Sequence, residues 1–191
     1  MKFKKIETIL KNKRTIVICE GPDCQWIGDG TAFYPCYKFP RLDEKNLPVI
    51  LDISEDKLDK YTILVKGLPK SVSFMDSIEN EIVLNRGEFE FVIDGMRLEP
   101  IETSSGMVLI NTKYLKPYSD EKEGIQLFER RSTIGVPVIA VKKGFMLVGM
   151  ITPIDIIDEK FISIMENIVT SSKLALKNAN PNNHQYDDVY E

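Results

Sequence analysis

The segment that is most informative about the fold runs from Asp94-Gly95 through Pro100 to Ile110-Asn111-Thr112-Lys113-Tyr114-Leu115. It repeats, in the same order, a pattern found earlier in the chain. The earlier copy is Asp29-Gly30, Pro35 and Leu42-Asp43-Glu44-Lys45-Asn46-Leu47. Asp-Gly between alternating apolar residues indicates a β-hairpin, because both central residues of such a turn need a positive φ. An apolar residue, then Asn or Asp, with Leu four residues later, indicates a strand end, a helix cap and a short helix. The two copies therefore predict a duplicated unit of hairpin and helix.

The remaining sequence predicts many short strands and few helices. Strands are expected at 15–19, 25–27, 31–35, 61–65, 89–93, 96–101, 107–110, 125–129, 136–141 and 145–151, and short helices at 43–52 and 112–118. Two terminal segments, 2–12 and 153–178, have the apolar spacing of amphipathic helices. Residues 67–87 hold Gly, Pro, Ser and Asn among scattered apolar positions, which predicts a long irregular connection that is mobile in part.

This order of elements favours an α+β fold with mainly antiparallel sheet. We expect two βαβββ units, at about 31–101 and 107–151, related by a pseudo-twofold axis. Together with the terminal helices they form a single duplicated domain over residues 1–178. The polar segment 179–191 is expected to be a disordered tail.

Composition narrows the function classes. The 191 residues carry a net charge of −4, which argues against indiscriminate coating of nucleic acid but leaves room for a local basic face. The chain has no apolar run of the roughly 18 residues that a membrane span needs. Its first residues lack the apolar stretch and cleavage site of a signal peptide. A cytoplasmic protein with no membrane contact is expected.

Metal and cofactor sites are not predicted. The three cysteines, Cys19, Cys24 and Cys36, do not follow the spacing of a zinc module, and the one histidine, His184, lies in the polar tail. Asp23 or Asp29 could complete a site in principle, but the cysteines are read as core or incidental thiols.

The expected function is non-enzymatic binding, because no nucleophile motif, metal-ligand set or phosphate loop occurs. The glycines of Gly28-Asp29-Gly30 join two strands, so they indicate a hairpin turn and not a phosphate loop. The alternative is a small-molecule-binding protein or hydrolase that uses carboxylates such as Asp29 and Asp94, which hold matched places in the two copies. Aspartate is equally favoured in such turns for local hydrogen bonding.

The strand and helix order resembles one domain of a DNA sliding clamp, a processivity factor built from two βαβββ units. The likeness is carried by Gly106–Lys116, by Ile125–Phe128 and by the hairpin that ends at Pro153. It implies that the short helices face DNA, which makes Arg41, Lys45, Lys113 and Lys116 candidate DNA-binding residues. Separately, Gln25–Gly30 followed by Tyr34-Pro35 resembles small proteins of clostridial prophages and mobile elements. The implied partner is DNA or a replication protein of such an element.

Other candidates concern interfaces and basic patches. Trp26, the one tryptophan, is a candidate interface anchor, with a core position as the alternative. Phe161 and Met165 begin an apolar stripe that continues through Ile168 and Val169. The stripe is expected to pack on the chain's own sheet or, as the second option, in a homodimer. Arg130-Arg131 and Lys142-Lys143 are read either as a phosphate-binding patch or as solvated turns.

Overall fold

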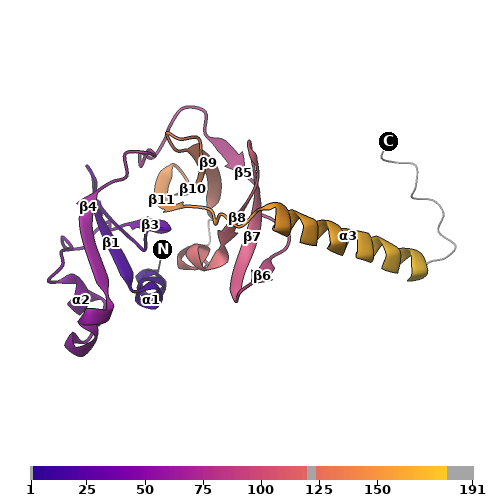
Figure 1. Ribbon diagram of the computed structural model, residues 1–191. Helices are drawn as coiled ribbons and strands as arrows, with labels where there is room; N and C mark the ends of the chain where they lie inside the picture. The colour runs from indigo at the N-terminus through magenta and orange to yellow at the C-terminus, as the bar shows by residue number, and fades with distance from the viewer. Residues whose placement is uncertain (1, 120–123, 180–191) are drawn as a thin grey trace. The chain divides into compact units, whose positions relative to one another are not determined.

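The computed structural model describes residues 2–119 and 124–179, and Figure 1 labels its elements. In chain order they are α1 (Phe3–Lys13), β1 (Thr15–Glu20), β2 (Gln25–Gly28), β3 (Ala32–Pro35), α2 (Leu47–Ile50), η1 (Glu55–Lys60), β4 (Thr62–Gly67), β5 (Ile82–Leu84), β6 (Phe91–Ile93), β7 (Met96–Thr103), β8 (Gly106–Asn111), η2 (Thr112–Tyr118), β9 (Gln126–Arg131), β10 (Pro137–Lys143), β11 (Met146–Ile151) and α3 (Glu159–Ala179). The elements η1 and η2 are 3₁₀-helices. The fold is α+β, as the sequence predicts.

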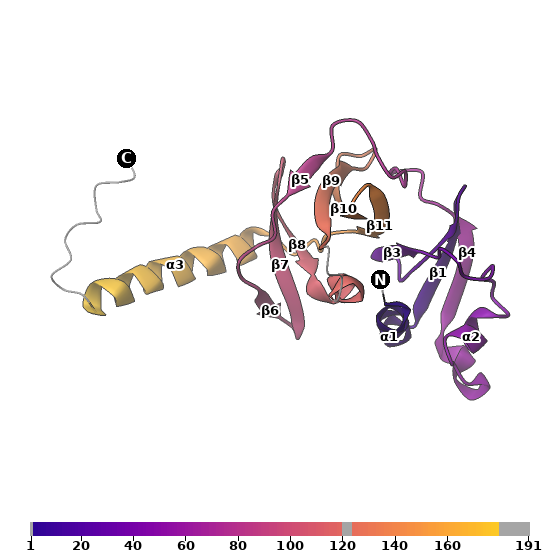
Figure 2. The same cartoon turned by 180° about the vertical axis from the view of Figure 1, so that it is seen from behind.

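The strands of the described residues form two sheets. The larger has eight strands in the order β4-β1-β2-β3-β11-β10-β9-β5, and the smaller has the order β6-β7-β8. The β1–β4 pair is parallel, whereas the other pairs are antiparallel, most of them between chain neighbours. Sequence alternation predicts the hairpins, but it does not reveal the parallel pair. Between these two strands the chain forms β2, β3, α2 and η1, and the two strands lie side by side (Figure 2).

The larger sheet is buried on both faces near β1. Ile16 and Ile18 belong to the main core with α1 and η2, whereas Val17 and Cys19 belong to a second apolar cluster on the opposite face. A strand covered on both sides needs a continuous apolar run, and Thr15–Cys19 supplies it. The second cluster includes residues of 68–74, which come directly after β4. The irregular connection therefore covers part of the sheet.

Several helix predictions differ from the structure in their extent. The 112–118 helix has the predicted bounds, but in 43–52 only Leu47–Ile50 is helical, with Pro48 in its first turn. The C-terminal helix begins at Glu159 and not near Pro153. The reason is local pairing, since the Ile154 amide donates to the Leu109 carbonyl at 2.8 Å and forms a β-bridge with β8.

The duplication is not confirmed. The first strand of each predicted unit does pair with the last strand of the other, as β3 with β11 and β8 with β7. The counterparts β4 and β9 differ, because β9 pairs with β10 of its own unit while β4 pairs with β1 outside it. The two copies of the sequence pattern thus enter different pairings.

Contacts divide the chain into two units, Met1–Ile154 and Asp155–Glu191. No residue of α3 is buried, and the expected single domain over 1–178 stays a prediction. None of the helices in the described part of the chain combines the length and apolar character that crossing a membrane requires. The predicted disordered tail, 179–191, lies outside the described residues except for Ala179, which ends α3.

Candidate functional site

The helix α1 is amphipathic and rich in lysine. Its apolar residues Ile6, Ile9 and Leu10 are buried, which fixes the opposite side toward solvent. The exposed or half-exposed cations of the segment are Lys2, Lys4, Lys5, Lys11, Lys13 and Arg14. Its one acidic residue, Glu7, pairs with Lys11 at 2.7 Å, and this hydrogen bond raises the pKa of Lys11. Six cations against one acid give the segment 2–14 a net positive charge.

The second element, η2, follows β8 without a loop. The Asn111 side chain caps it by accepting a hydrogen bond from the Lys113 amide at 3.0 Å. Tyr114, Leu115 and Tyr118 are buried beneath it. Residues three apart eclipse one another in a 3₁₀-helix, so Lys113 and Lys116 project from the same side. The Lys113 ammonium lies 4.6 Å from the centre of the Tyr114 ring, while Lys116 is exposed.

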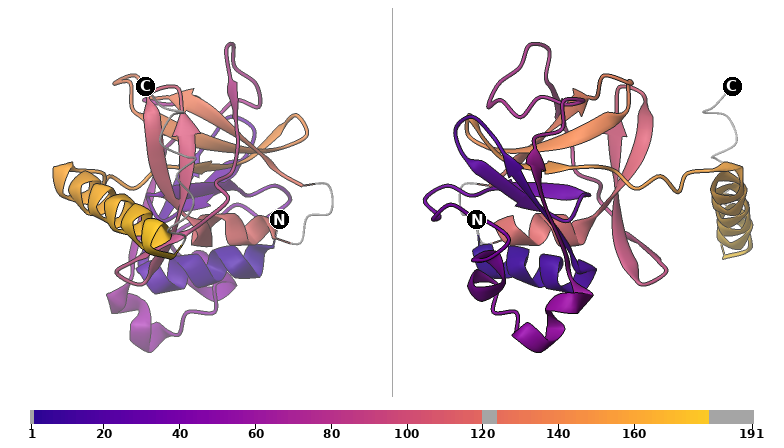
Figure 3. Two further views of the ribbon diagram at one scale, coloured as in Figure 1. Left: turned by 90° about the vertical axis from the view of Figure 1, so that its right-hand side faces the viewer. Right: turned by 60° about the vertical axis from the view of Figure 1, so that its left-hand side comes forward.

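The ends of α1 and η2 meet (Figure 3). The Lys2 amide donates to the Pro117 carbonyl at 2.8 Å, and the Lys5 ammonium donates to the Ser119 hydroxyl. Two cationic segments that lie far apart in the sequence thereby come into contact. We call Lys2, Lys5, Lys113 and Lys116 the α1–η2 basic face.

The sequence identified half of this face. Lys113 and Lys116 were predicted, whereas Lys2 and Lys5 were missed. The available signal was an amphipathic segment in which lysines alternate with apolar residues and Glu7 is the one acid. Such a segment does not show which surface it joins, because the contact with η2 is long-range.

The other two predicted DNA contacts lie on the loop between β3 and α2. The Arg41 guanidinium pairs with Glu20 at 3.0 Å, so its charge is compensated. Lys45 follows Asp43 and Glu44, and the Asp43 carboxylate accepts hydrogen bonds from the amides of Lys45 and Asn46. Neither residue makes a contact with η2 among the interactions of the described residues.

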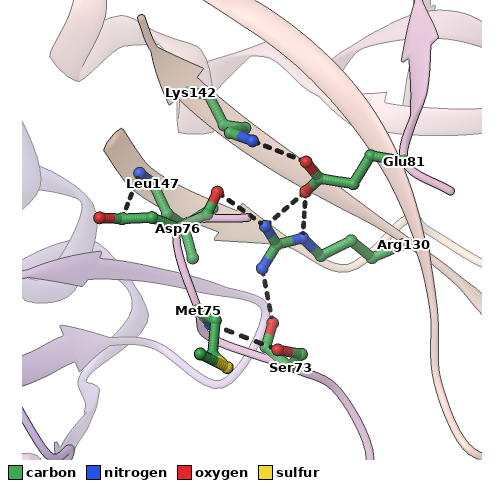
Figure 4. Close-up of polar contacts among 7 residues, drawn as sticks. All are labelled: Ser73, Met75, Asp76, Glu81, Arg130, Lys142 and Leu147. Carbon is green, nitrogen blue, oxygen red and sulfur yellow. Dashed lines mark hydrogen bonds and ion pairs between the residues drawn. The ribbon is translucent and has the colours of Figure 1, made fainter. Parts of the chain in front are cut away.

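Arg130 and Lys142 do not form the phosphate-binding patch that is one interpretation of their sequence. Both side chains are buried and bind opposite oxygens of Glu81, with Arg130 Nε at 2.8 Å and Lys142 Nζ at 2.6 Å (Figure 4). Arg130 also donates to the backbone carbonyl of Ser73 at 2.8 Å. We call Glu81, Arg130 and Lys142 the Glu81 network. It fixes the irregular 68–81 connection to β9 and β10.

The alternative carboxylate pair is not assembled. Asp29 is buried at the β2–β3 turn, where it accepts hydrogen bonds from the Thr31 and Ala32 amides and from the Tyr114 hydroxyl. Asp94 is exposed at the β6–β7 turn of the other sheet. No hydrogen bond joins the two among the described residues. Asp29 therefore has the structural role of a turn aspartate.

The predicted interface residues fall into two groups. Trp26 is 4% exposed and contacts the edge of Phe74, with ring centres 5.0 Å apart, so the alternative reading as a core residue is correct. Phe161 and Met165 lie on α3, where both are half-buried and no residue is fully buried. The stripe thus contains no fully buried residue.

A polar cleft of about 370 Å³ lies where β1 and β2 meet the loop after β3. Its lining includes Cys24, Cys36, Tyr37, Glu20 and Arg41. Burial raises the pKa of Cys36 to about 12 and also raises the pKa of Cys24, so both thiols are protonated near neutral pH. A protonated thiol is a poor nucleophile and metal ligand. The described residues contain no group of three His, Cys, Asp or Glu side chains that could hold a metal ion.

Comparisons with protein-family models, curated proteins and solved structures find no match to this chain. The resemblance to a sliding-clamp domain therefore stays a prediction, and the functional argument rests on the chain's own geometry.

Proposed function

We propose that this protein is a non-enzymatic binding protein that holds DNA through phosphate contacts of the α1–η2 basic face. The observation that carries the proposal is the junction of α1 with η2, which joins Lys2 and Lys5 to Lys113 and Lys116. In its wider form, the proposal is that the protein associates with DNA in a clamp-like manner and has a replication protein as a second partner. The proposed source is a phage or mobile element, and the proposed location is the cytoplasm.

The chemistry of the face suits a sequence-independent contact. Lysine ammonium groups are compact charges on flexible stems, which favours contact with phosphates without reading of bases. Each phosphate that is neutralised releases condensed counterions, so affinity falls by a slope of about 0.9 per contact on a logarithmic salt scale. With four lysines on the face, binding is expected to be weak at physiological salt and clear at low salt.

The test is fluorescence anisotropy with a labelled duplex at about 50 mM and about 200 mM salt, the range in which counterion release acts strongly. The test variant is Lys113→Ala with Lys116→Ala. The control is Lys57→Ala with Lys60→Ala, which removes two exposed lysines at the same spacing from the 3₁₀-helix η1. Three acidic residues of η1 lie between and beside these two lysines, namely Glu55, Asp56 and Asp59. The test variant is expected to lose most binding and to have a shallower salt slope, while the control retains both.

Two results would contradict the proposal. One is the absence of duplex binding by the unmodified chain at about 50 mM salt, where electrostatic association is favoured. The other is an equal loss of binding in the η2 and η1 variants, which would show that total charge matters and the α1–η2 basic face does not. Circular dichroism of each variant checks that the fold is retained.

A further inference from the structure

The helix α3 exposes a long apolar surface. Ile162, Ile168, Val169 and Leu176 are between 49% and 66% exposed, and no residue of the helix is buried. In proteins most of the stability of a helix comes from packing of its apolar side, and the 21-residue helix α3 has no buried residue to supply it. The feature to be explained is therefore what covers α3.

The apolar residues of α3 recur every seven positions. One row is Phe161, Ile168 and Ala175, and the next is Ile162, Val169 and Leu176. Met165 and Ser172 continue the same side, four residues after Phe161 and Ile168. Residues at these spacings form one stripe along a helix, and a seven-residue repeat is the pattern of a helix that packs against another helix.

A charged row borders the stripe on the side of Ile162, Val169 and Leu176. Its members Glu159, Glu166 and Lys173 are also seven residues apart, so they share one line of the helix. The carboxylates lie in the N-terminal half and the ammonium group in the C-terminal half. Glu166 and Lys173 have no ion-pair partner among the described residues.

We infer that α3 pairs antiparallel with α3 of a second copy of this chain and so forms a homodimer. In an antiparallel pair, a given flank of one helix lies opposite the same flank of the other helix. The acidic half of the charged row on one copy therefore lies beside the basic half of the row on the other copy. A parallel pair would bring this row to the opposite flank. Because a twofold axis relates the copies, each Glu166–Lys173 contact occurs twice.

Side-chain size also favours this arrangement. An axis between Ile168 and Val169 places Phe161 beside Leu176 of the second copy, and Met165 beside its Ser172. Large residues of the first half thus meet smaller residues of the second half, which fills the interface evenly. In this arrangement Glu166 is offset from Lys173 of the second copy by two residues, which is about 3 Å along the helix axis. In a parallel pair in register, each residue would lie opposite its own copy. The large Phe161 would then face Phe161, and the small Ser172 and Ala175 would face Ser172 and Ala175.

The first experiment measures the mass of the full chain by light scattering during size exclusion, from low to high micromolar concentration. The unmodified chain is expected to reach twice its 21.8 kDa. Ile168→Asp places a charge of each copy at the axis, where apolar burial is required, and is expected to weaken the dimer by about 100-fold or more. Thr170→Asp, which adds the same charge on the opposite side of α3, serves as the control and is expected to remain dimeric.

The second experiment tests orientation by charge exchange. Glu166→Lys and Lys173→Glu are each expected to weaken the dimer, by about 3-fold to 10-fold for contacts at the rim. The double variant restores opposite charges across an antiparallel pair and is expected to recover the affinity. Failure of the double variant to recover would contradict the antiparallel arrangement.

Three outcomes would overturn the inference. The first is a strict monomer at high micromolar concentration, and the second is a dimer that Ile168→Asp leaves intact. The third is a monomer that sediments with phosphatidylglycerol vesicles unless Ile168 is replaced, which would identify a membrane surface as the occupant. This inference uses residues of α3 alone, so it stands or falls separately from the proposed DNA contact.

Discussion

The connection 68–81 and the helix α3 are opposites in regularity and in burial. The connection has almost no regular structure, yet Arg130 binds the carbonyl of Ser73 and the carboxylate of Glu81, and Phe74 packs on Trp26. The helix α3 is the longest helix in the described part of the chain, yet none of its residues is buried. Regular hydrogen bonding and burial of side chains are therefore separate properties in this protein.

The difference has a simple physical origin. A helix satisfies its own backbone groups, so α3 can form wherever its apolar stripe finds a partner, including a second copy. An irregular segment must satisfy its backbone elsewhere, and here the buried cations Arg130 and Lys142 hold the connection in place. Buried charges demand partners, so the Glu81 network places residues 73–81 in a defined position.

The largest expected effect comes from breaking the fixed connection. Arg130→Met leaves Lys142 as the one cation on Glu81 and removes the donors to Ser73 and Asp76. Loss of one partner from a buried ion pair costs about 3–5 kcal/mol, and urea denaturation measures this as a lower free energy of unfolding. The control is Arg41→Met, because Arg41 is 78% exposed and its pair contributes no more than about 1 kcal/mol. Equal effects of the two substitutions would show that the Glu81 network does not hold the connection.

An intermediate effect is expected from acid. Burial raises the pKa of Glu81, but the hydrogen bonds from Lys142 and Arg130 outweigh it, so the pKa lies below its ordinary value of 4.5. A depressed native pKa stabilises the fold above the unfolded pKa, and that stabilisation is lost as the pH falls through the native pKa. The free energy of unfolding is therefore expected to fall from pH 4.5 downward.

The contribution of Glu81 can be separated by substitution. Glu81→Gln should reduce this acid dependence in part, since Glu129 also has a lowered pKa and continues to titrate. The control is Glu79→Gln, an exposed neighbour that should leave the acid dependence intact. Denaturation series at several pH values measure both, and an unchanged dependence in Glu81→Gln would contradict the assignment.

The smallest expected effect comes from removing α3. A chain that ends at Asp158 should unfold with a free energy within about 0.5 kcal/mol of the full chain at concentrations where both are monomeric, because no residue of α3 is buried. The same truncation should abolish any dependence of the full chain's melting temperature on concentration. A large loss of stability on truncation would show that α3 packs on its own chain.

The sequence determined the local structure well. Asp94 and Gly95 both have positive φ, 49° and 75°, as their hairpin turn requires, and Asn111 caps a helix with the predicted bounds. At Asp29-Gly30 the turn is also present, but Gly30 alone adopts a positive φ, because the Asp29 carboxylate binds the amides of Thr31 and Ala32. These features depend on neighbours a few residues away, so the local pattern contains the information.

Only the tertiary structure decided which segments meet. The parallel pairing of β4 with β1, the burial of Arg130 and Lys142 and the junction of α1 with η2 all join residues that lie far apart in the chain. In the sequence, the basic pairs at 130–131 and 142–143 cannot be distinguished from exposed basic residues, because a local pattern does not show which carboxylate lies opposite. The stripe of α3 is equally clear in the sequence, but its partner depends on surfaces beyond the helix. Periodicity specifies which side of an element must be covered, and long-range packing specifies what covers it.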